Sequence, residues 1–195
     1  MPVPPIETSP ALRVVAVSGS LQSPSRTTAL VGELLASLGR ERPIDATIIE
    51  LSSVGPLFAG ALTRAQLPAA AELQLQRIEN ADLLVVASPV YRASFTGLFK
   101  HLFDFVDQYA LVDTPVLLAA TGGSDRHALI IEHQLRPLFG FFQALTLPIG
   151  VYAKDSDFTD YRVTDPDLHQ RIERAVQRAL PMLELTLAPS VPGAW

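Results

Sequence analysis

The stretch AVSGSLQSPSRTTALVGELL, residues 16–35, decides the fold because it joins a strand pattern directly to a helix pattern. The apolar run ends at Ser18-Gly19-Ser20, seven residues rich in hydroxyl groups follow, and a helical period then begins. A buried strand that continues into a helix is the start of a β-α-β unit, the building block of parallel sheets. This stretch therefore predicts an α/β protein.

The same alternation continues along the chain. Runs of β-branched apolar residues predict strands at 13–18, 46–50, 83–88, 116–121 and near 147–152. Segments of helical period predict helices at 25–38, 69–80, 96–105, 125–145 and 166–185. Five strands and five helices make an open, doubly wound sheet with helices on both faces. Such sheets bind ligands beyond the carboxyl ends of their strands, where the winding reverses.

Length and the two ends of the chain limit its organisation. With 195 residues the chain is long enough for one sizeable core, so we expect a single domain over residues 1–195. Proline-rich pieces at 1–11 and 188–195 are expected to be flexible ends, or alternatively to take part in subunit contacts. The first of them lacks the basic start and apolar core of a secretory signal. No run approaches the roughly 20 apolar residues of a membrane span, so we expect a soluble protein with no membrane contact. The absence of cysteine fits a cytoplasmic location.

Composition excludes further classes of function. Without cysteine the chain has no disulfide, no thiolate metal ligand and no cysteine nucleophile, and we expect no metal site. Fifteen basic against twenty acidic residues give a net charge of −5, and no stretch concentrates Lys or Arg as a phosphate-backbone binder would. Nucleic acid is therefore not an expected partner.

The loop after the first strand is a candidate phosphate site. Its hydroxyl groups surround the start of a helix, whose unpaired N–H groups and dipole favour an anion. Arg26 either adds a charged donor or points into water. The loop contains neither the dinucleotide motif G-x-G-x-x-G nor the P-loop motif, so a single terminal phosphate is the better match. The alternative is that Ser25 is an ordinary helix cap and the other hydroxyl groups are hydrated loop residues.

The ends of the third and fourth strands suggest a site for a flat ring. Pro89 removes an N–H and forces its neighbour into an extended conformation, so Tyr91 and Arg92 follow on a fixed turn. Thr121-Gly122-Gly123 lets the backbone approach a ligand closely. The alternatives are an aromatic that covers the core and a plain strand-to-helix turn. Together the three strand ends describe a ligand with a phosphate and a flat, amide-rich ring, which is the outline of FMN.

Three motifs carry a family resemblance: SGSLQSPSRTTAL, ADLLVVASPVYRASFTGLFKHLFDF and LLAATGGSDRHALIIEHQLRPLFGFF. From about Val14 to Asp160 the chain resembles the NAD(P)H-dependent FMN reductases, especially the reductase components of two-component alkanesulfonate and methanesulfonate monooxygenases. The resemblance implies a flavodoxin-like sheet of order 2-1-3-4-5 and an enzyme that reduces FMN with NADH or NADPH. It also implies a homodimer or homotetramer that passes reduced FMN to an FMNH2-dependent monooxygenase, in sulfonate desulfonation.

The resemblance also assigns a flavin site. It places no catalytic residue, because hydride transfer between nicotinamide and flavin depends on stacking and orientation. Two departures from relatives concern the donors: Leu21-Gln22 stands where some have a basic residue, and Arg92 where many have lysine. The cofactor-binding residues so implied are Ser18, Ser20, Ser25, Arg26, Thr27 and Thr28 for the phosphate, Pro89, Val90, Tyr91 and Arg92 for the ring, and Thr121, Gly122 and Gly123 beside the ring.

His133 in LIIEHQLRP matches the position of an inserted residue that, in the alkanesulfonate reductases, makes a π-helical turn at a subunit interface. The alternative is an ordinary surface or packing histidine. The helix around it carries more apolar residues than one buried stripe needs, so part of it is expected to pack against another subunit. His101 and His127 are expected to be ordinary helix residues.

Two other functions fit the same fold. A flavodoxin-like electron carrier would hold FMN permanently, but such carriers have a strongly acidic face and this chain is only five charges negative. A quinone or azo reductase would keep bound FMN and use a different acceptor. The coenzyme, NADH or NADPH, and the identity of the monooxygenase are left open by the sequence.

Overall fold

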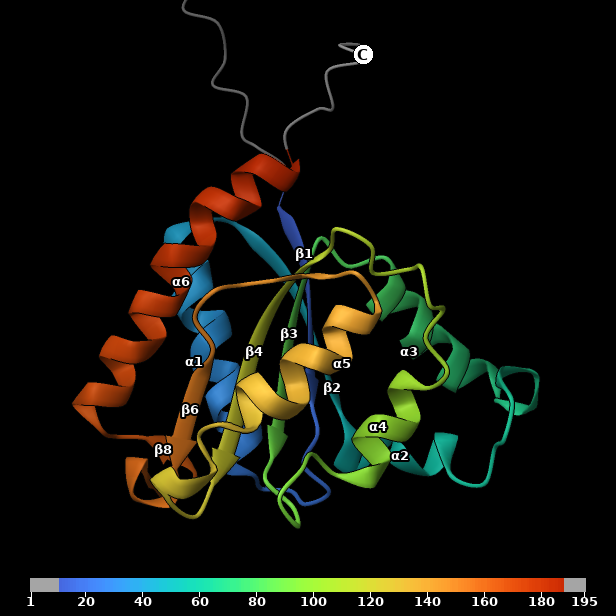
Figure 1. The fold of residues 1–195 in the computed structure, drawn as a ribbon, viewed down its shortest axis with the longest axis horizontal. Helices are drawn as coiled ribbons and strands as arrows, with labels where there is room; N and C mark the ends of the chain where they lie inside the picture. Colours follow the sequence, from blue (N-terminus) through green and yellow to red (C-terminus); the bar gives the residue numbers. More distant parts are fainter. Residues whose placement is uncertain (1–10, 188–195) are drawn as a thin grey trace, which may run out of the picture.

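The computed structural model of the protein describes residues 11–187, and its centre is a parallel sheet in the order β2-β1-β3-β4-β5. A further strand, β6, also pairs directly with β4, further along β4 than β5 does (Figure 1). The chain moves outward from β1 to β2 and then returns to β3 on the other side, so the winding reverses between β1 and β3. The predicted order 2-1-3-4-5 is confirmed. The strands are β1 (Leu12–Ser18), β2 (Ile44–Glu50), β3 (Leu83–Pro89), β4 (Pro115–Gly122), β5 (Leu145–Thr146) and β6 (Val151–Lys154).

The fifth position of the sheet differs from the prediction, because two short strands occupy it in place of one. Thr146 pairs with Val116 in β5, and Val151 resumes the pairing with β4 in β6. Pro148, between them, has no N–H to donate to β4. Gly150 passes close to a helix side chain: a Cβ there would lie 2.6 Å from Ile131 Cγ2. The sheet therefore has six strands over five positions.

Helices cover both faces of the sheet (Figure 1). α1 and α6 pack on one face, and α2 to α5 pack on the other. The short helix α2 is not predicted by the sequence, because Gly55 and Pro56 interrupt its apolar pattern. None of the helices in the described part of the chain is long and apolar enough to cross a membrane. The helices are α1 (Arg26–Glu41), α2 (Leu51–Phe58), α3 (Ala69–Glu79), α4 (Gly97–Phe103), α5 (Arg136–Phe141) and α6 (Pro166–Leu187).

Strands β1 and β3 are buried on both faces, which explains their continuous apolar sequences. Val15 and Val17 face the core under α2 to α5, whereas Val14 and Ala16 face the core under α1 and α6. The predicted flexible ends at 1–11 and 188–195 lie outside the described residues, apart from Ala11.

The single long helix predicted at 125–145 is wrong. Its sequence forms a 3₁₀ turn at Asp125–His127, a π-helix at Ile131–Leu135 and then α5. The N–H of Arg136 bonds the carbonyl of Ile131, which is the wider repeat of a π-turn. The segment ends where Gln143 adopts a left-handed backbone with φ of 55°. His133 therefore lies in the middle of a π-helical turn, as its sequence position indicates.

Arg64 ties the loop before α3 to the helix itself. Its guanidinium donates to Glu72 at 2.6 and 2.9 Å and to Glu79 at 2.5 and 3.0 Å. The Glu79 carboxylate also accepts the N–H of Asp107 at 3.0 Å. One arginine thus holds two turns of α3 and the chain after α4 together. The hydrogen bond to Arg64 lowers the pKa of Glu72 below its usual value of 4.5.

Replacing Arg64 with methionine is expected to lower the free energy of unfolding by about 1–3 kcal/mol, because two partly buried carboxylates lose their partner. Because Glu72 has a lower pKa in the folded protein than in the unfolded chain, its interaction with Arg64 stabilises the fold at pH values above the ordinary pKa. This stabilisation is lost as the pH falls through the pKa that Glu72 has in the folded protein. Urea unfolding of both proteins at pH 7 and near pH 3.5 checks this. A difference that stays constant over that range would contradict the ion-pair explanation.

Candidate functional site

The carboxyl ends of β1, β3 and β4 meet around one cavity of about 220 Å³, at the place where the winding reverses. The loop between β1 and α1 forms one wall, and the residues after β3 and β4 form the others. Nine of the thirteen residues predicted for cofactor binding line this cavity. They are Ser20, Ser25, Arg26, Thr27, Pro89, Val90, Thr121, Gly122 and Gly123.

Helix α1 begins at this cavity and is capped by Ser25. The Ser25 hydroxyl oxygen accepts the N–H groups of Thr27 at 3.1 Å and Thr28 at 3.4 Å. The N-cap interpretation therefore holds for Ser25, and within residues 11–187 its own hydroxyl proton has no acceptor. The first turn of α1 contains no acidic residue to oppose the positive end of the helix dipole. Capping and anion binding are compatible at this helix start.

A buried hydroxyl pair joins the first and fourth strand ends. Thr27 Oγ1 and Thr121 Oγ1 lie 2.7 Å apart, and both side chains are buried. Ser18 and Thr28 do not line the cavity: their hydroxyl groups bond each other at 2.8 Å, and Thr28 donates to Glu50 at 3.2 Å. Ser18 and Thr28 therefore stabilise the loop through hydrogen bonds without lining the cavity.

The turn after β3 is fixed by backbone hydrogen bonds. The N–H of Val90 donates to the Thr121 carbonyl at 2.7 Å, and Tyr91 and Ser94 exchange bonds of 2.7 and 3.2 Å. Between them Arg92 and Ala93 have φ of 52° and 67°, an uncommon conformation for residues with a Cβ. The Arg92 guanidinium lies 5.8 Å from the centre of the Tyr91 ring. Both side chains are exposed and stand outside the cavity lining.

The loop after β4 is held by Tyr152. Its hydroxyl donates to the Ser124 carbonyl at 2.6 Å, and burial raises the pKa of this phenol above 10, so it keeps its proton. A Cβ on Gly122 would overlap the Tyr152 hydroxyl, which explains the glycine at this position. A Cβ on Gly19 would similarly lie 2.8 Å from the Phe99 ring. Glycine thus permits close backbone approach at both loops.

Four residues that are not among the predicted site residues also line this cavity: Gln22 and Pro24 in the loop after β1, and Asp155 and Tyr161. Asp155 Oδ1 lies 3.3 Å from a guanidinium nitrogen of Arg26, and the Arg26 guanidinium carbon lies 5.9 Å from the Tyr161 ring centre. Both follow β6, whose carboxyl end points to the same edge as that of β4. Tyr161 belongs to a hairpin with strands β7 (Phe158–Thr159) and β8 (Arg162–Val163), too short to show an alternating pattern.

The π-helix touches the turn after β3. Ser94 donates to the side chain of Gln134 at 3.0 Å, and a cavity of about 210 Å³ between the two segments is lined by Val90, Ala93 and His133 among others. Val90 also lines the strand-end cavity, so this residue borders both cavities.

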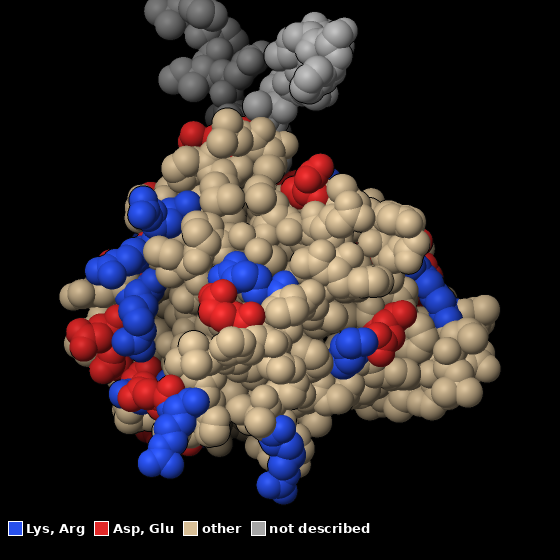
Figure 2. Space-filling view, viewed as in Figure 1, with Lys and Arg blue, Asp and Glu red and all other residues tan. Residues whose placement is uncertain are grey.

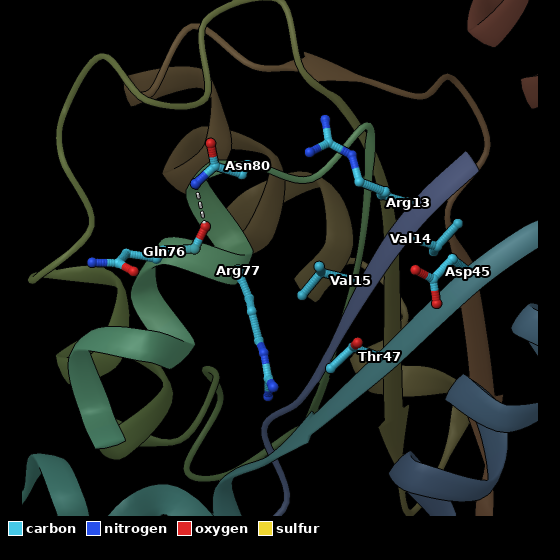
Figure 3. Close-up of a pocket in the computed structure, with 8 residues that line it drawn as sticks. All are labelled: Arg13, Val14, Val15, Asp45, Thr47, Gln76, Arg77 and Asn80. Carbon is cyan, nitrogen blue, oxygen red and sulfur yellow. Dashed lines mark hydrogen bonds between the residues drawn. The ribbon is translucent and has the colours of Figure 1, made fainter. Parts of the chain in front are cut away.

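Another cavity, of about 250 Å³, lies at the opposite end of the sheet (Figure 3). It is formed by the first halves of β1 and β2 and the end of α3, away from the carboxyl ends of the strands. Arg13, one of the two arginines that line it, is bound by Asp82 at 2.6 and 3.1 Å. This cavity joins none of the predicted site residues. His101 also lies elsewhere, with its Nε2 3.0 Å from the Phe58 carbonyl oxygen.

Comparisons with known proteins agree with this geometry. The sequence profile of the family described as NADPH-dependent FMN reductase matches residues 12–159. The chain is 57% identical over 178 residues to the NADH-dependent FMN reductase SfnF of Pseudomonas fluorescens Pf0-1, covering 91% of this chain and 95% of that protein. It is also 57% identical over 175 residues to an FMN reductase (NADPH) of Pseudomonas aeruginosa PAO1, covering 90% and 94%.

A solved structure described as the apo form of the NADH:FMN oxidoreductase EMOB is similar as well. It superimposes with a TM-score of 0.77 at 30% identity, over 93% of this chain and 92% of that one. The fold, the family profile and the close relatives point the same way, and the chain belongs to the NADPH-dependent FMN reductase family.

Proposed function

We propose that the protein reduces FMN with NADH or NADPH, binds the flavin at the strand-end cavity, and releases reduced FMN to a partner monooxygenase. The observation that carries this proposal is the cavity itself. It combines the start of α1, with an available hydroxyl proton and an arginine, and two close-packed backbone loops from neighbouring strands. A phosphate and a flat ring need these two kinds of surface side by side.

In this proposal each wall of the cavity has one role. Ser20, Ser25, Arg26 and Thr27 bind the phosphate, while Ser18 and Thr28 hold the loop. Pro89, Val90 and Thr121 to Gly123 lie against the ring, leaving one ring face open, and the turn at Tyr91 and Arg92 lies next to it outside the cavity lining. FMN supplies the hydride-accepting chemistry, and the chain contributes orientation and close approach of the coenzyme.

The partner is proposed to be an FMNH2-dependent monooxygenase of sulfonate desulfonation. This rests on the similarity of the three motifs to the reductases of such two-component systems. Because reduced nicotinamide coenzymes are present inside cells, we expect the reaction to take place in the cytoplasm. Relatives of equal identity are named for NADH and for NADPH, so either coenzyme is consistent with the proposal.

A steady-state assay tests the reaction. NADH and NADPH are each compared with FMN, FAD and riboflavin as acceptors, and purified protein is examined for bound flavin. Preferred turnover of free FMN by protein that loses its yellow colour on gel filtration supports the proposal. Permanently yellow protein that reduces quinones or azo compounds, and not free FMN, supports the alternative reductase. Yellow protein that oxidises neither coenzyme supports an electron carrier.

The protein is also proposed to be a homodimer or homotetramer that buries the face around α5. Leu129 is 63% exposed and Phe141 65% exposed there, which is unusual for large apolar side chains. Charged side chains gather along α6, while the surface over α4 and α5 is mostly uncharged (Figure 2). A second copy of the chain is the proposed occupant.

Replacing Phe141 with arginine is expected to shift the oligomer to a smaller species, because the charge would be buried between subunits. Light scattering after gel filtration measures the mass, and Leu185→Arg, at an exposed residue of α6, serves as the control. A wild-type protein that runs as a monomer would contradict the proposed interface.

A further inference from the structure

Arg26 is already engaged in the structure. Its guanidinium lies 3.3 Å from the Asp155 carboxylate and 5.9 Å from the centre of the Tyr161 ring. All three residues line the strand-end cavity. The side chains of Arg26 and Asp155 are 45% and 55% exposed, so the pair is hydrated and easily exchanged. An anion that enters this cavity meets an arginine that has an acidic neighbour.

Asp155 and Tyr161 are held in place by the segment that follows β6. Buried Asp157 anchors this segment: its carboxylate accepts the N–H of Lys154 at 3.1 Å and the Arg171 guanidinium at 3.0 Å. The β7–β8 hairpin then turns through Asp160 and Tyr161, whose φ values are 47° and 58°. Two consecutive left-handed residues other than glycine are uncommon. This turn places Tyr161 in the lining of the strand-end cavity.

No other cation neutralises Asp155 within residues 11–187. The neighbouring Lys154 ammonium is bound to Asp125 at 3.0 Å, and the Asp155 carboxylate forms an ion pair with Arg26 alone. When Arg26 turns to a phosphate dianion, the Asp155 carboxylate loses its partner and lies close to a like charge. Both effects oppose binding of the phosphate.

We propose that Asp155 competes with the FMN phosphate for Arg26 and thereby keeps FMN affinity low enough for reduced FMN to leave. This inference rests on the proposed function, because it assumes that the phosphate binds at Arg26. In this role Asp155 lowers the affinity for FMN. An enzyme that must release its flavin needs such a limit on affinity, whereas a permanent flavin carrier does not.

The test is an equilibrium titration of Asp155→Asn with FMN and with riboflavin, followed by flavin fluorescence. The near-isosteric amide keeps the side-chain shape and removes the charge. FMN is expected to bind about threefold to tenfold more tightly, while riboflavin, which lacks the phosphate, binds unchanged. The matched control is Asp160→Asn. It removes a charge from the same segment at a residue outside the cavity lining, and asparagine tolerates its left-handed backbone.

A second titration separates this inference from the proposed function. Arg26→Ala is compared with the double variant Arg26→Ala/Asp155→Asn, in which the gain from Asp155→Asn is expected to shrink to about twofold or less. If Arg26→Ala lowers FMN affinity selectively but Asp155→Asn leaves it unchanged or weaker, competition by Asp155 is wrong and the phosphate site stands. If Arg26→Ala affects both flavins equally, the phosphate site itself is wrong.

Discussion

Replacing Arg26 with alanine is expected to weaken FMN binding by about 1–3 kcal/mol, roughly fivefold to 150-fold, and to leave riboflavin binding nearly unchanged. The guanidinium is the only charged donor among the residues that line the strand-end cavity in the described part of the chain. A phosphate dianion that loses this donor keeps the hydroxyl and N–H groups of α1 but no opposite charge. Flavin fluorescence titrations with both ligands measure the difference.

The controls for this prediction lie on the same helix. Arg40→Ala removes an exposed arginine at the far end of α1 and is expected to change neither affinity. Arg26→Lys keeps the charge but loses the fork of donors, so an intermediate loss is expected. Ser25→Ala is expected to weaken FMN as well, but it also removes the helix cap and lowers stability by about 1 kcal/mol. Equal losses for FMN and riboflavin in Arg26→Ala would contradict the phosphate site.

Deleting His133 is expected to convert the π-helical turn into regular α-helix and to make the protein retain flavin. The π-turn lies beside the turn after β3, which it contacts through Gln134 and Ser94. Removing one residue shifts that contact and packs the segment more tightly around the proposed ring site. Release-limited turnover then falls about tenfold for each 1.4 kcal/mol of added affinity for the product.

Three measurements check the deletion: bound FMN after gel filtration, oligomeric mass, and the rate of free FMN reduction. His133→Ala is the matched control, because it removes the imidazole and keeps the extra residue, and it is expected to behave much like the wild type. A deletion variant that is free of flavin, with wild-type mass and turnover, would show that the π-turn has no part in release.

The parallel sheet could be predicted because its central strands, such as Leu83–Pro89 and Pro115–Gly122, are buried on both faces and form continuous apolar runs. The short helix α2 could not, because Pro56 and Gly55 mask its pattern. The break between β5 and β6 depends on Pro148 and on the packing of Gly150 against Ile131, which is a tertiary contact. Likewise, a helix with ordinary periodicity gives no sign from spacing alone of where a π-turn divides it.

The candidate site could be predicted in part for a similar reason. Ser25 and Arg26 follow one predicted strand and Thr121 ends another, and parallel strands bring their carboxyl ends to one edge. Asp155 could not be found, because the sequence predicts a single fifth strand that ends near 152, whereas the strand β6 continues to Lys154 and carries Asp155 to the site. Tyr161 comes from a hairpin of two-residue strands, below the length at which alternation is visible.

A crystal structure of the protein with FMN is the most direct test of the account. The phosphate is expected at the start of α1, within hydrogen-bond distance of Ser25 and Arg26. The ring is expected against the loops that begin at Pro89 and Thr121, with one ring face open to the coenzyme. A ring bound elsewhere, for example in the cavity between β1, β2 and α3, or one sealed on both faces, would contradict it.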